Sequence, residues 1–542
     1  MPLAVLAGRG QAVVRGRGRG AARNRGRGGR GGRGRGRAGR VQNPPALPDI
    51  QWEQFNGPNE RSPGENIPFN EVPGPSRVAM LAESLGDFFK LFIPDTLVQS
   101  WVTETNRYAT QSRIVKPSTM KWSDVTFEEI LAYLGMLIAM GLVNLPSISD
   151  FFSTEPILAH PWFSSILSRD RFQQINRYFH VSNETLYPND KLAKLRPVVD
   201  NAITKFRALW TPHREISIDE QMIGTRCRVG FIQYMSAKPV KFGVKNWVLA
   251  DSVYPYVCNF QIYTGRDERT PEHGLSKRVV MDLIQPYLAK GHRLYVDNFY
   301  SSPHLFKELY DQNTLACGTV RQERKGMPNE LKTKNTRAYK KGDSSFMKHG
   351  SLTVMRWKDK RDVFALSTFH GNSVEDDMPK KPELITSYNQ FMNGVDKNDQ
   401  LLTYYSINVK SMKWWKKVFW RLLELSIVNM YQIMKFKGPI THKRLRLDLA
   451  QLLVQPLLDA RTIRSGLPGP GRPAADLDRL RGKHFGTGSK KGNARGRCKV
   501  CAKQKKPNGK CRDTKTANYC ERCEVFLCEG NCFKIYHTQQ NF

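Results

Sequence analysis

The sequence predicts an α/β protein in which a mixed β-sheet is flanked by helices and followed by a small Cys-rich module. Up to about residue 212, apolar residues repeat at three-to-four spacing, as in "TFEEILAYLGMLIAMGL", which indicates helices. "KFGVKNWVLADS" and "YVCNFQIYTG" follow. Both are rich in β-branched and aromatic residues and they are joined by the turn "SVYP", so they predict a β-hairpin. Seven of the ten cysteines lie after residue 497, which sets the C-terminal module apart.

The composition points to a polyanionic partner. The 542 residues are enough for roughly three domains of about 150 residues each, and the 40% hydrophobic content is ample for sizeable cores. Lys and Arg outnumber Asp and Glu 85 to 49, which gives a net charge of +36. Such an excess favours nucleic acid over a membrane surface as the partner, and a merely soluble basic protein is the alternative.

The first 80 residues predict no folded domain. Residues 1 to about 40 carry twelve arginines, no acidic residue and many glycines, and we expect disorder because such a segment cannot bury a core. Arg-Gly tracts bind nucleic acid through charge and stacking; a solvated tail without an essential role is the alternative. Residues 41–80 are Pro-rich and mildly acidic, as in a linker, and order is expected from near Leu81. The N-terminal "PLAVLAG" is too short for a signal-peptide core.

Residues 81–212 are predicted to be helical. "SLGDFFKLFIPDTLVQSWVTETNRYA" and "LSRDRFQQINRYFHV" share the three-to-four spacing of apolar residues. The longest apolar stretch, from Ile130 to Val143, falls short of the roughly 20 residues that span a bilayer. We therefore predict a buried core helix there, and no membrane partner.

Residues 213–323 contain the predicted sheet. The region near 320–385 alternates polar runs with short β-like pieces such as "SLTVMRWK", and we interpret it as an insertion or a continued β region. "WWKKVFWRLLELSIVNMYQIMKF" predicts a long amphipathic helix from near Lys413. "RSGLPGPGRPAA" marks a linker, which we place at 464–494, before the Cys-rich module at 495–542.

The C-terminal cysteines are spaced like metal ligands. With no secretion signal, the reducing cytosol or nucleus is favoured, where clustered cysteines are better interpreted as metal ligands than as disulfides. Eight candidate ligands suit two tetrahedral Zn2+ ions. In a cross-braced arrangement, one ion would take Cys498, Cys501, Cys520 and Cys523, and the other would take Cys511, Cys528, Cys532 and His537.

Metal binding would supply most of the folding free energy of so short a module, roughly 10 kcal/mol or more per site. From Lys491 onward, twelve Lys and Arg stand against four Asp and Glu. This charge is consistent with DNA contact, and a protein-binding zinc module is the alternative.

Three aspartates lie in different local settings. Asp219 follows the alternating run in "EISIDEQM", Asp297 ends the run in "HRLYVDNFYSS", and Asp396 opens the polar stretch "MNGVDKNDQLL". Acidic side chains at such positions can converge and hold divalent cations through hard carboxylate oxygens. Taken singly, each is better interpreted as a helix cap or a surface charge.

Taken together, "SIDEQM", "CRVGFIQYMSAKPVKFGVKNWVLADS", "YVDNFYSS" and "NGVDKNDQ" resemble the piggyBac transposase family in order and spacing. The resemblance spans roughly residues 85–542 and leaves out the Arg-Gly N-terminus. It implies a ribonuclease H-like catalytic core in which Asp219, Asp297 and Asp396 bind two Mg2+ ions. Asp399 matches a further acidic position close to the third.

The resemblance also implies a domain layout. A helical dimerisation and DNA-binding domain (81–212 and 406–463) would flank the core (213–323 and 383–405), which an insertion domain (324–382) interrupts. It implies a homodimer acting on double-stranded DNA, a zinc module that reads transposon ends, and integration at TTAA sites.

A basic stretch with interleaved aromatic residues follows the first aspartate. Arg228, Tyr234, Lys238, Lys241 and Lys245 could contact phosphates of DNA. A solvated strand face is the alternative for the lysines.

Two functions from different classes fit these features. The first is a nuclear cut-and-paste DNA transposase that uses two-metal-ion hydrolysis and strand transfer. The second is a host-captured descendant that binds DNA, dimerises and regulates without cleaving. The intact acids favour the enzyme. A general RNA-binding protein built around the Arg-Gly tail would explain neither the zinc ligands nor the acids.

Overall fold

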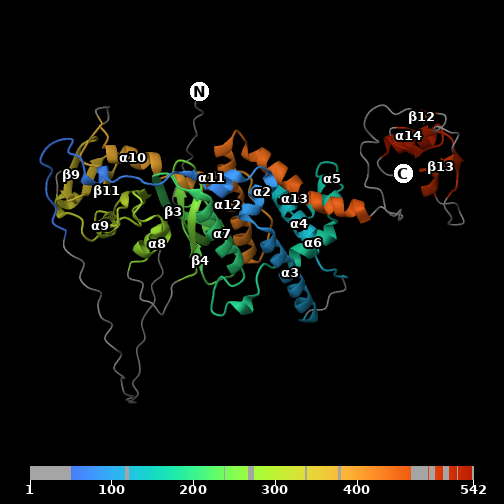
Figure 1. Ribbon diagram of the computed structural model, residues 1–542, viewed down its shortest axis with the longest axis horizontal. Helices are drawn as coiled ribbons and strands as arrows, with labels where there is room; N and C mark the ends of the chain where they lie inside the picture. Colours follow the sequence, from blue (N-terminus) through green and yellow to red (C-terminus); the bar gives the residue numbers. More distant parts are fainter. Residues whose placement is uncertain are drawn as a thin grey trace, which may run out of the picture. The chain divides into compact units, whose positions relative to one another are not determined.

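The structure is a computed structural model, shown as a ribbon in Figure 1. The Arg-Gly tail, most of the predicted linker at 464–494 and Cys511 lie outside the residues that it describes. The described residues are 50–115, 121–236, 238–265, 274–335, 339–375, 380–464, 486–487, 495–504, 512–521 and 523–539.

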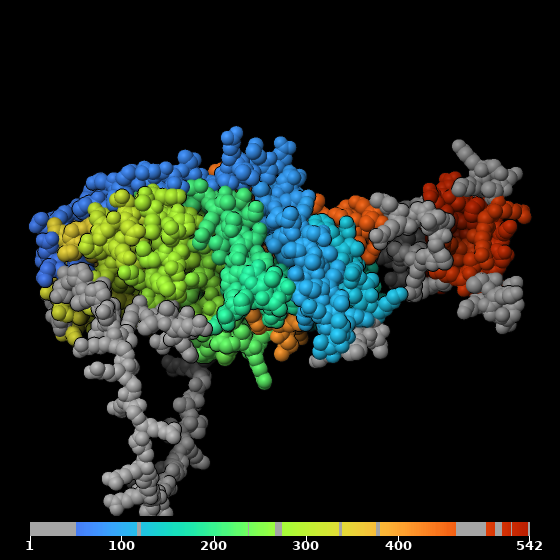
Figure 2. All heavy atoms as spheres, turned by 60° about the horizontal axis from the view of Figure 1, so that its bottom comes forward, coloured from blue at the N-terminus to red at the C-terminus, as the bar shows by residue number. Residues whose placement is uncertain are grey.

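Residues 50–76 are ordered, so the prediction of a linker up to residue 80 is wrong. Glu53 forms an antiparallel bridge with Lys348, and the Ser62 hydroxyl donates to Thr368 O at 3.1 Å. Figure 2 shows this blue segment lying along the green and yellow atoms of the sheet region. An extended segment that bonds through its backbone to other strands has no apolar period, and the sequence therefore did not reveal it. Its elements are η1 (Pro63–Asn66) and β1 (Gly74–Pro75), and the short helix α1 (Arg77–Leu81) follows it.

The predicted helical region is helical, and two long C-terminal helices pack with it. The apolar stretch from Ile130 to Gly141 is buried inside one helix, α4 (Phe127–Leu142), as expected for a core helix. A Cβ at Gly135 would lie 2.9 Å from Ala450 O, so glycine is needed for α13 (His442–Arg464) to approach this closely. Among the described residues, no helix is long and apolar enough to cross a membrane. The helices are α2 (Leu85–Phe92), α3 (Asp95–Val115), α4 (Phe127–Leu142), α5 (Pro161–Ile166), α6 (Arg169–Tyr178), α7 (Arg196–Leu209), α12 (Trp414–Lys437) and α13 (His442–Arg464).

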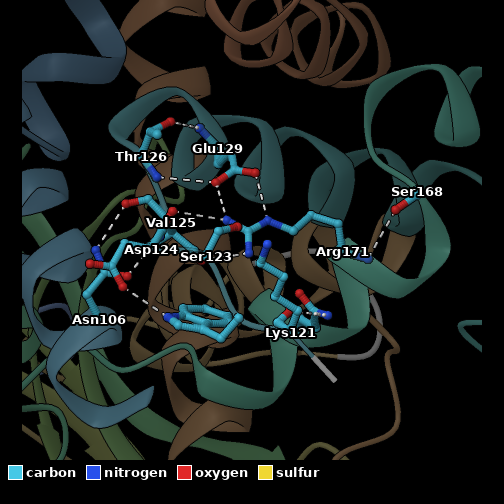
Figure 3. Close-up of polar contacts among 11 residues, drawn as sticks. Asn106, Lys121, Ser123, Asp124, Val125, Thr126, Glu129, Ser168 and Arg171 are labelled. Atoms are coloured by element: carbon cyan, nitrogen blue, oxygen red, sulfur yellow. Dashed lines mark hydrogen bonds and ion pairs between the residues drawn. The ribbon is translucent and has the colours of Figure 1, made fainter. Parts of the chain in front are cut away.

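Arg171 joins α6 to the start of α4 (Figure 3). Thr126 and Glu129 form a capping box at the N-terminus of α4, and Arg171 Nε donates to the Glu129 carboxylate at 2.8 Å. The Arg171 guanidinium also donates to the Ser123 carbonyl at 2.9 Å and lies over the ring of Trp122. Both charged side chains are only 14% exposed. A bidentate pair of this kind fixes two helices and a loop at once.

We expect Arg171→Ala to lower the free energy of unfolding by about 2 kcal/mol, because it removes charge-assisted hydrogen bonds and leaves Glu129 partly buried without its partner. Arg169, two residues earlier in the same helix, pairs with Asp170 in solvent, so Arg169→Ala should cost no more than about 0.5 kcal/mol. Chemical denaturation of both variants measures this difference. Equal losses would show that Arg171 does not clamp the two helices.

A mixed nine-stranded sheet forms the other half of the protein. Its main order is β4-β5-β3-β7-β8-β11-β10-β9, and β6 also pairs with β5. The predicted hairpin is confirmed as β5 and β6, which pair antiparallel. The strands are β3 (Glu215–Gly224), β4 (Ile232–Tyr234), β5 (Phe242–Asp251), β6 (Val257–Ile262), β7 (Arg293–Val296), β8 (Leu315–Thr319), β9 (Ser344–His349), β10 (Leu352–Lys358) and β11 (Asp362–Ser367).

The middle of the sheet is parallel. β7 pairs in parallel with both β3 and β8, and parallel neighbours need a crossover connection. The helices α8 (Leu275–Ile284) and α9 (Pro303–Asp311) supply these crossovers. Two further helices, α10 (Glu383–Phe391) and α11 (Gly394–Tyr404), contact β3.

The region near 320–385 continues the core sheet. β11 pairs antiparallel with β8, and β10 and β9 add to β11 in turn. The strand pairing shows a continued β region, and the insertion domain at 324–382 stays a prediction.

Candidate active site

The parallel pairing of β3 and β7 brings two of the three aspartates together. Ile218 lies opposite Val296 in the register, so the next residues, Asp219 and Asp297, come at the same level of two neighbouring strands. One carboxylate oxygen each from Asp219, Asp297 and Glu220 lie within 4.8 Å of one another. We call these three residues the acid cluster.

The turn after β7 holds Asp297 in place. The backbone N–H of Phe299 donates to Asp297 Oδ1 at 2.8 Å, and the N–H groups of Tyr300 and Ser301 donate to the Asp297 carbonyl at 3.2 Å. The strand therefore ends in a tight turn that presents the carboxylate.

Glu220 was missed by the sequence analysis. Neighbours on a strand point to opposite faces, so a residue next to Asp219 was given no role. The structure nevertheless brings an oxygen of Glu220 within reach of both aspartates. The acidic pair "DE" at the end of an alternating run is the only trace of it in the sequence.

Two lysines face the acid cluster. Lys238 Nζ lies 3.7 Å from Asp219 Oδ2 and donates to the Glu220 carbonyl at 3.2 Å. Lys245 Nζ lies 2.8 Å from Glu220 Oε1. These contacts put two ammonium groups at the edge of the acid cluster.

The carboxyl groups titrate unusually because they are crowded and partly buried. Burial raises the pKa of Asp219 to about 8, helped by its hydrogen bond with Glu220 and opposed by Lys238. Burial also raises the pKa of Asp297. Although burial disfavours the charged form of Glu220, its hydrogen bond with Asp219 and the Lys245 ammonium lower its pKa. Added positive charge would favour ionisation of all three.

The donor set of the acid cluster fits Mg2+. Carboxylate oxygens are the hard ligands that this ion prefers, and three of them converge from two strands. Asp219, Glu220 and Asp297 are the residues that would hold it.

The structure does not place Asp396 in the acid cluster. Asp396 is exposed in the first turn of α11, and Asp399, one turn on, lies 3.7 Å from Arg421. Burial raises the pKa of Asp399 to about 6, opposed by Arg421 and Lys238. Both acids interact electrostatically with the Lys238 ammonium, so they flank the cluster without joining it.

A pair of buried amides docks α11 on β3. Asn398 accepts from Gln221 Nε2 at 3.0 Å and donates to Pro255 O at 2.9 Å. Gln221 lies two residues after Asp219, and Asn398 lies two residues after Asp396. The hydrogen bond therefore fixes the helix that carries the third aspartate beside the strand that carries the first.

The other predicted DNA contacts lie on the surface around the C-terminal end of β3. Arg228, Tyr234 and Lys241 are exposed, whereas Lys238 and Lys245 are engaged with the acids. Beside them is a cavity of about 720 Å³ whose charged lining residues are all basic: Arg226, Lys241, Lys410 and Lys417. Such a surface suits a phosphate backbone.

Four C-terminal cysteines form a closed group, which corrects the expected ligand pairing. Cys498 and Cys501 lie with Cys528 and Cys532, not with the second CxxC pair. Cys501 Sγ is 3.9 Å from Cys528 Sγ and 3.6 Å from Cys532 Sγ. Four thiolates around one Zn2+ at about 2.3 Å would be about 3.8 Å apart, so the spacing fits that ion.

The second group consists of Cys520, Cys523 and His537. Cys523 Sγ lies 3.5 Å from His537 Nε2, and His537 Nδ1 lies 2.8 Å from the Phe533 carbonyl. A hydrogen bond from Nδ1 orients the imidazole ring so that Nε2 is the nitrogen that would bind a metal, as in many zinc sites. Sequence spacing could not show which CxxC pairs share an ion, because the strands β15 (Tyr519–Cys520) and β16 (Val525–Phe526) and the helix α14 (Asn531–Thr538) decide it.

Comparison with known proteins places this geometry in a family. A sequence profile described as Transposase IS4 matches residues 86–431, more than half of the chain. The chain belongs to the piggyBac transposase family. Human PiggyBac transposable element-derived protein 3 is 25% identical over 479 residues, which cover 84% of this chain and 76% of that protein. Human PiggyBac transposable element-derived protein 5 is 24% identical over 418 residues, covering 72% and 78%.

A solved structure of this transposase family has the same fold. The piggyBac transposase in a synaptic complex with hairpin DNA, determined by cryo-EM, superposes with a TM-score of 0.68 at 24% identity. The match covers 85% of this chain and 99% of that chain. The piggyBac-family chain thus has a mixed α/β fold built on a large mixed sheet.

Proposed function

We propose that this piggyBac-family chain is a cut-and-paste DNA transposase that excises DNA and integrates it at TTAA sites. The observation that carries the proposal is the acid cluster, in which two neighbouring parallel strands bring Asp219, Glu220 and Asp297 together. Family membership supports the same reaction class.

We assign β6-β5-β3-β7-β8 to the ribonuclease H-like core that the family resemblance implies. Its antiparallel and parallel pairings support the assignment. Two Mg2+ ions, when bound, would activate the attacking water or 3′-hydroxyl and stabilise the leaving oxygen. The chain supplies the rest: Asp219, Glu220 and Asp297 as ligands, Asp396 from α11 as a fourth acid, and the turn at Phe299 that orients Asp297.

DNA would lie over the basic surface next to the acid cluster. Arg226, Arg228 and Lys241 are exposed there, and the described residues that line the cavity beside them include no acidic residue. We propose that these side chains hold the backbone of double-stranded DNA and that Tyr234 packs against it. Phosphate contacts of this kind position the strand without reading its sequence.

The C-terminal module completes the proposed reaction. Two Zn2+ ions would fold it, one held by Cys498, Cys501, Cys528 and Cys532 and the other by Cys520, Cys523 and His537. Cys511, outside the described residues, is the candidate fourth ligand of the second ion. We propose that the folded module reads transposon ends, and that the transposase acts as a homodimer in the nucleus.

A second function is kept because the curated human relatives are named as element-derived proteins. In that alternative the chain binds DNA and regulates without cutting. A reporter assay separates the two: cells receive the protein and a marker flanked by the element's own terminal repeats and TTAA. The transposase predicts repaired donor sites with a single TTAA. Intact donors alone, at full protein expression, would favour the regulator.

A further inference from the structure

The ammonium of Lys238 lies where acidic side chains from two elements converge. Its Nζ is 3.7 Å from Asp219 Oδ2 and donates to the Glu220 carbonyl at 3.2 Å. Asp396 and Asp399 on α11 also interact with it electrostatically. The Lys238 ammonium thus lies at the edge of the acid cluster, in contact with Asp219 and with the backbone of Glu220.

Lys238 is held differently from the other lysine at this site. Lys245 extends from the middle of β5, and its ammonium lies 5.1 Å from the ring of Trp247 and 5.0 Å from that of Phe299. Lys238 belongs to the turn between β4 and β5, where Pro239 and Val240 are exposed. The Lys238 side chain can therefore swing into solvent, whereas the Lys245 side chain is confined.

Displacement of Lys238 would carry its charge to the DNA. The next residues of the turn, Pro239 to Lys241, line the basic cavity described above. If the Lys238 ammonium moves away from Asp219 toward these residues, it approaches the surface where we place the phosphate backbone of DNA.

We propose that Lys238 is a built-in counter-ion of the acid cluster, which divalent cations displace, and that the displaced ammonium then contacts a DNA phosphate. The second half of the proposal rests on the proposed function. The first half concerns metal binding alone. In the absence of metal the lysine keeps the acids together and away from unwanted cations, and metal loading and DNA contact become coupled through one side chain.

The first test is calorimetric titration of Mg2+ and Mn2+ into the full-length protein without DNA, at alkaline pH, where the carboxylates are ionised. Lys238→Met should bind the metal at least about tenfold more tightly than wild type, because a competing charge about 4 Å from a ligand has been removed. Lys241→Met is the matched control: it loses the same charge three residues away, is exposed, and should leave the affinity unchanged. Unchanged or weaker binding by Lys238→Met would overturn the proposal, and Lys238→Gln guards against an effect of Met itself.

The second test measures how binding to a random DNA duplex depends on salt. With metal, Lys238→Met should reduce the slope of log K against log salt by about one, as expected for a lost phosphate contact. Without metal it should leave the slope unchanged, while Lys241→Met lowers the slope in both conditions. An equal reduction with and without metal would contradict displacement, and no reduction with metal would contradict the phosphate contact.

The outcomes separate this proposal from the proposed function. If wild type binds no divalent cation, both the counter-ion role of Lys238 and the proposed function are contradicted. If wild type binds metal and Lys238→Met binds it equally well, only the counter-ion role of Lys238 is contradicted. If Lys238→Met binds metal more tightly and wild type cuts no DNA, the counter-ion role of Lys238 is supported and the proposed transposase activity is contradicted.

Discussion

Asp297→Asn should abolish DNA cleavage and leave DNA binding intact. The amide keeps the size of the side chain and can still accept from the N–H of Phe299, which lies 2.8 Å from Asp297 Oδ1. It loses the negative charge that would hold a divalent cation between β3 and β7. Cleavage should fall at least about a thousandfold, since several kcal/mol of transition-state stabilisation disappear.

The control for this variant is Asp311→Asn. Asp311 is 54% exposed at the end of α9 and pairs with Lys307 one turn earlier. The Asp311→Asn variant therefore loses the same charge away from the acid cluster. Its cleavage rate should match wild type within about twofold. Cleavage rates on an end-bearing duplex and affinities for the same duplex give both readouts. Comparable cleavage by wild type and Asp297→Asn would remove Asp297 from the catalytic assignment.

Cys501→Ser should unfold much of the C-terminal module. Cys501 Sγ lies within 4 Å of two other thiols, those of Cys528 and Cys532, and a hydroxyl is a poor zinc ligand. Zinc content should fall from about two to about one ion per chain, because each structural site holds one ion with four ligands. Loss of a site removes roughly 10 kcal/mol of binding free energy that also folds the module.

Loss of the folded zinc module should also weaken DNA binding. We expect Cys501→Ser to weaken affinity for transposon ends more than affinity for random duplex, because the basic surface near the acid cluster is unchanged. Cys227→Ser is the control: it makes the same chemical change at a buried cysteine outside the metal-ligand groups and should keep full zinc content. Wild-type protein purified without zinc, or equal losses on both DNAs, would contradict end reading by a zinc module.

The sequence identified the part of the site that lies on strand ends. Asp219 and Asp297 each follow an alternating run, and such runs form neighbouring strands in the structure. Glu220 was missed because strand alternation gives a residue next to Asp219 no reason to reach the same point. Asp396 lies on a helix, where its position depends on the buried contact between Asn398 and Gln221. That contact joins residues 177 positions apart, so no local pattern reveals it.

The errors in the predicted fold and zinc-ligand pairing have a similar cause. Residues 50–76 carry no apolar period, yet Glu53 pairs through its backbone with Lys348 and the Ser62 hydroxyl donates to the Thr368 carbonyl, both far away in the chain. The division of the zinc ligands follows from which thiols the short strands and α14 bring together. Cys498 and Cys501 meet Cys528 and Cys532, and the spacing of two CxxC pairs fits either division equally well.

The most direct measurement is cleavage of an end-bearing DNA duplex by the purified full-length protein at increasing Mg2+ concentration. The account predicts breaks with a free 3′-hydroxyl at the transposon end, which increase with Mg2+ and disappear with a chelator. A protein that binds the same duplex tightly and yields no break at any Mg2+ or Mn2+ concentration would contradict it.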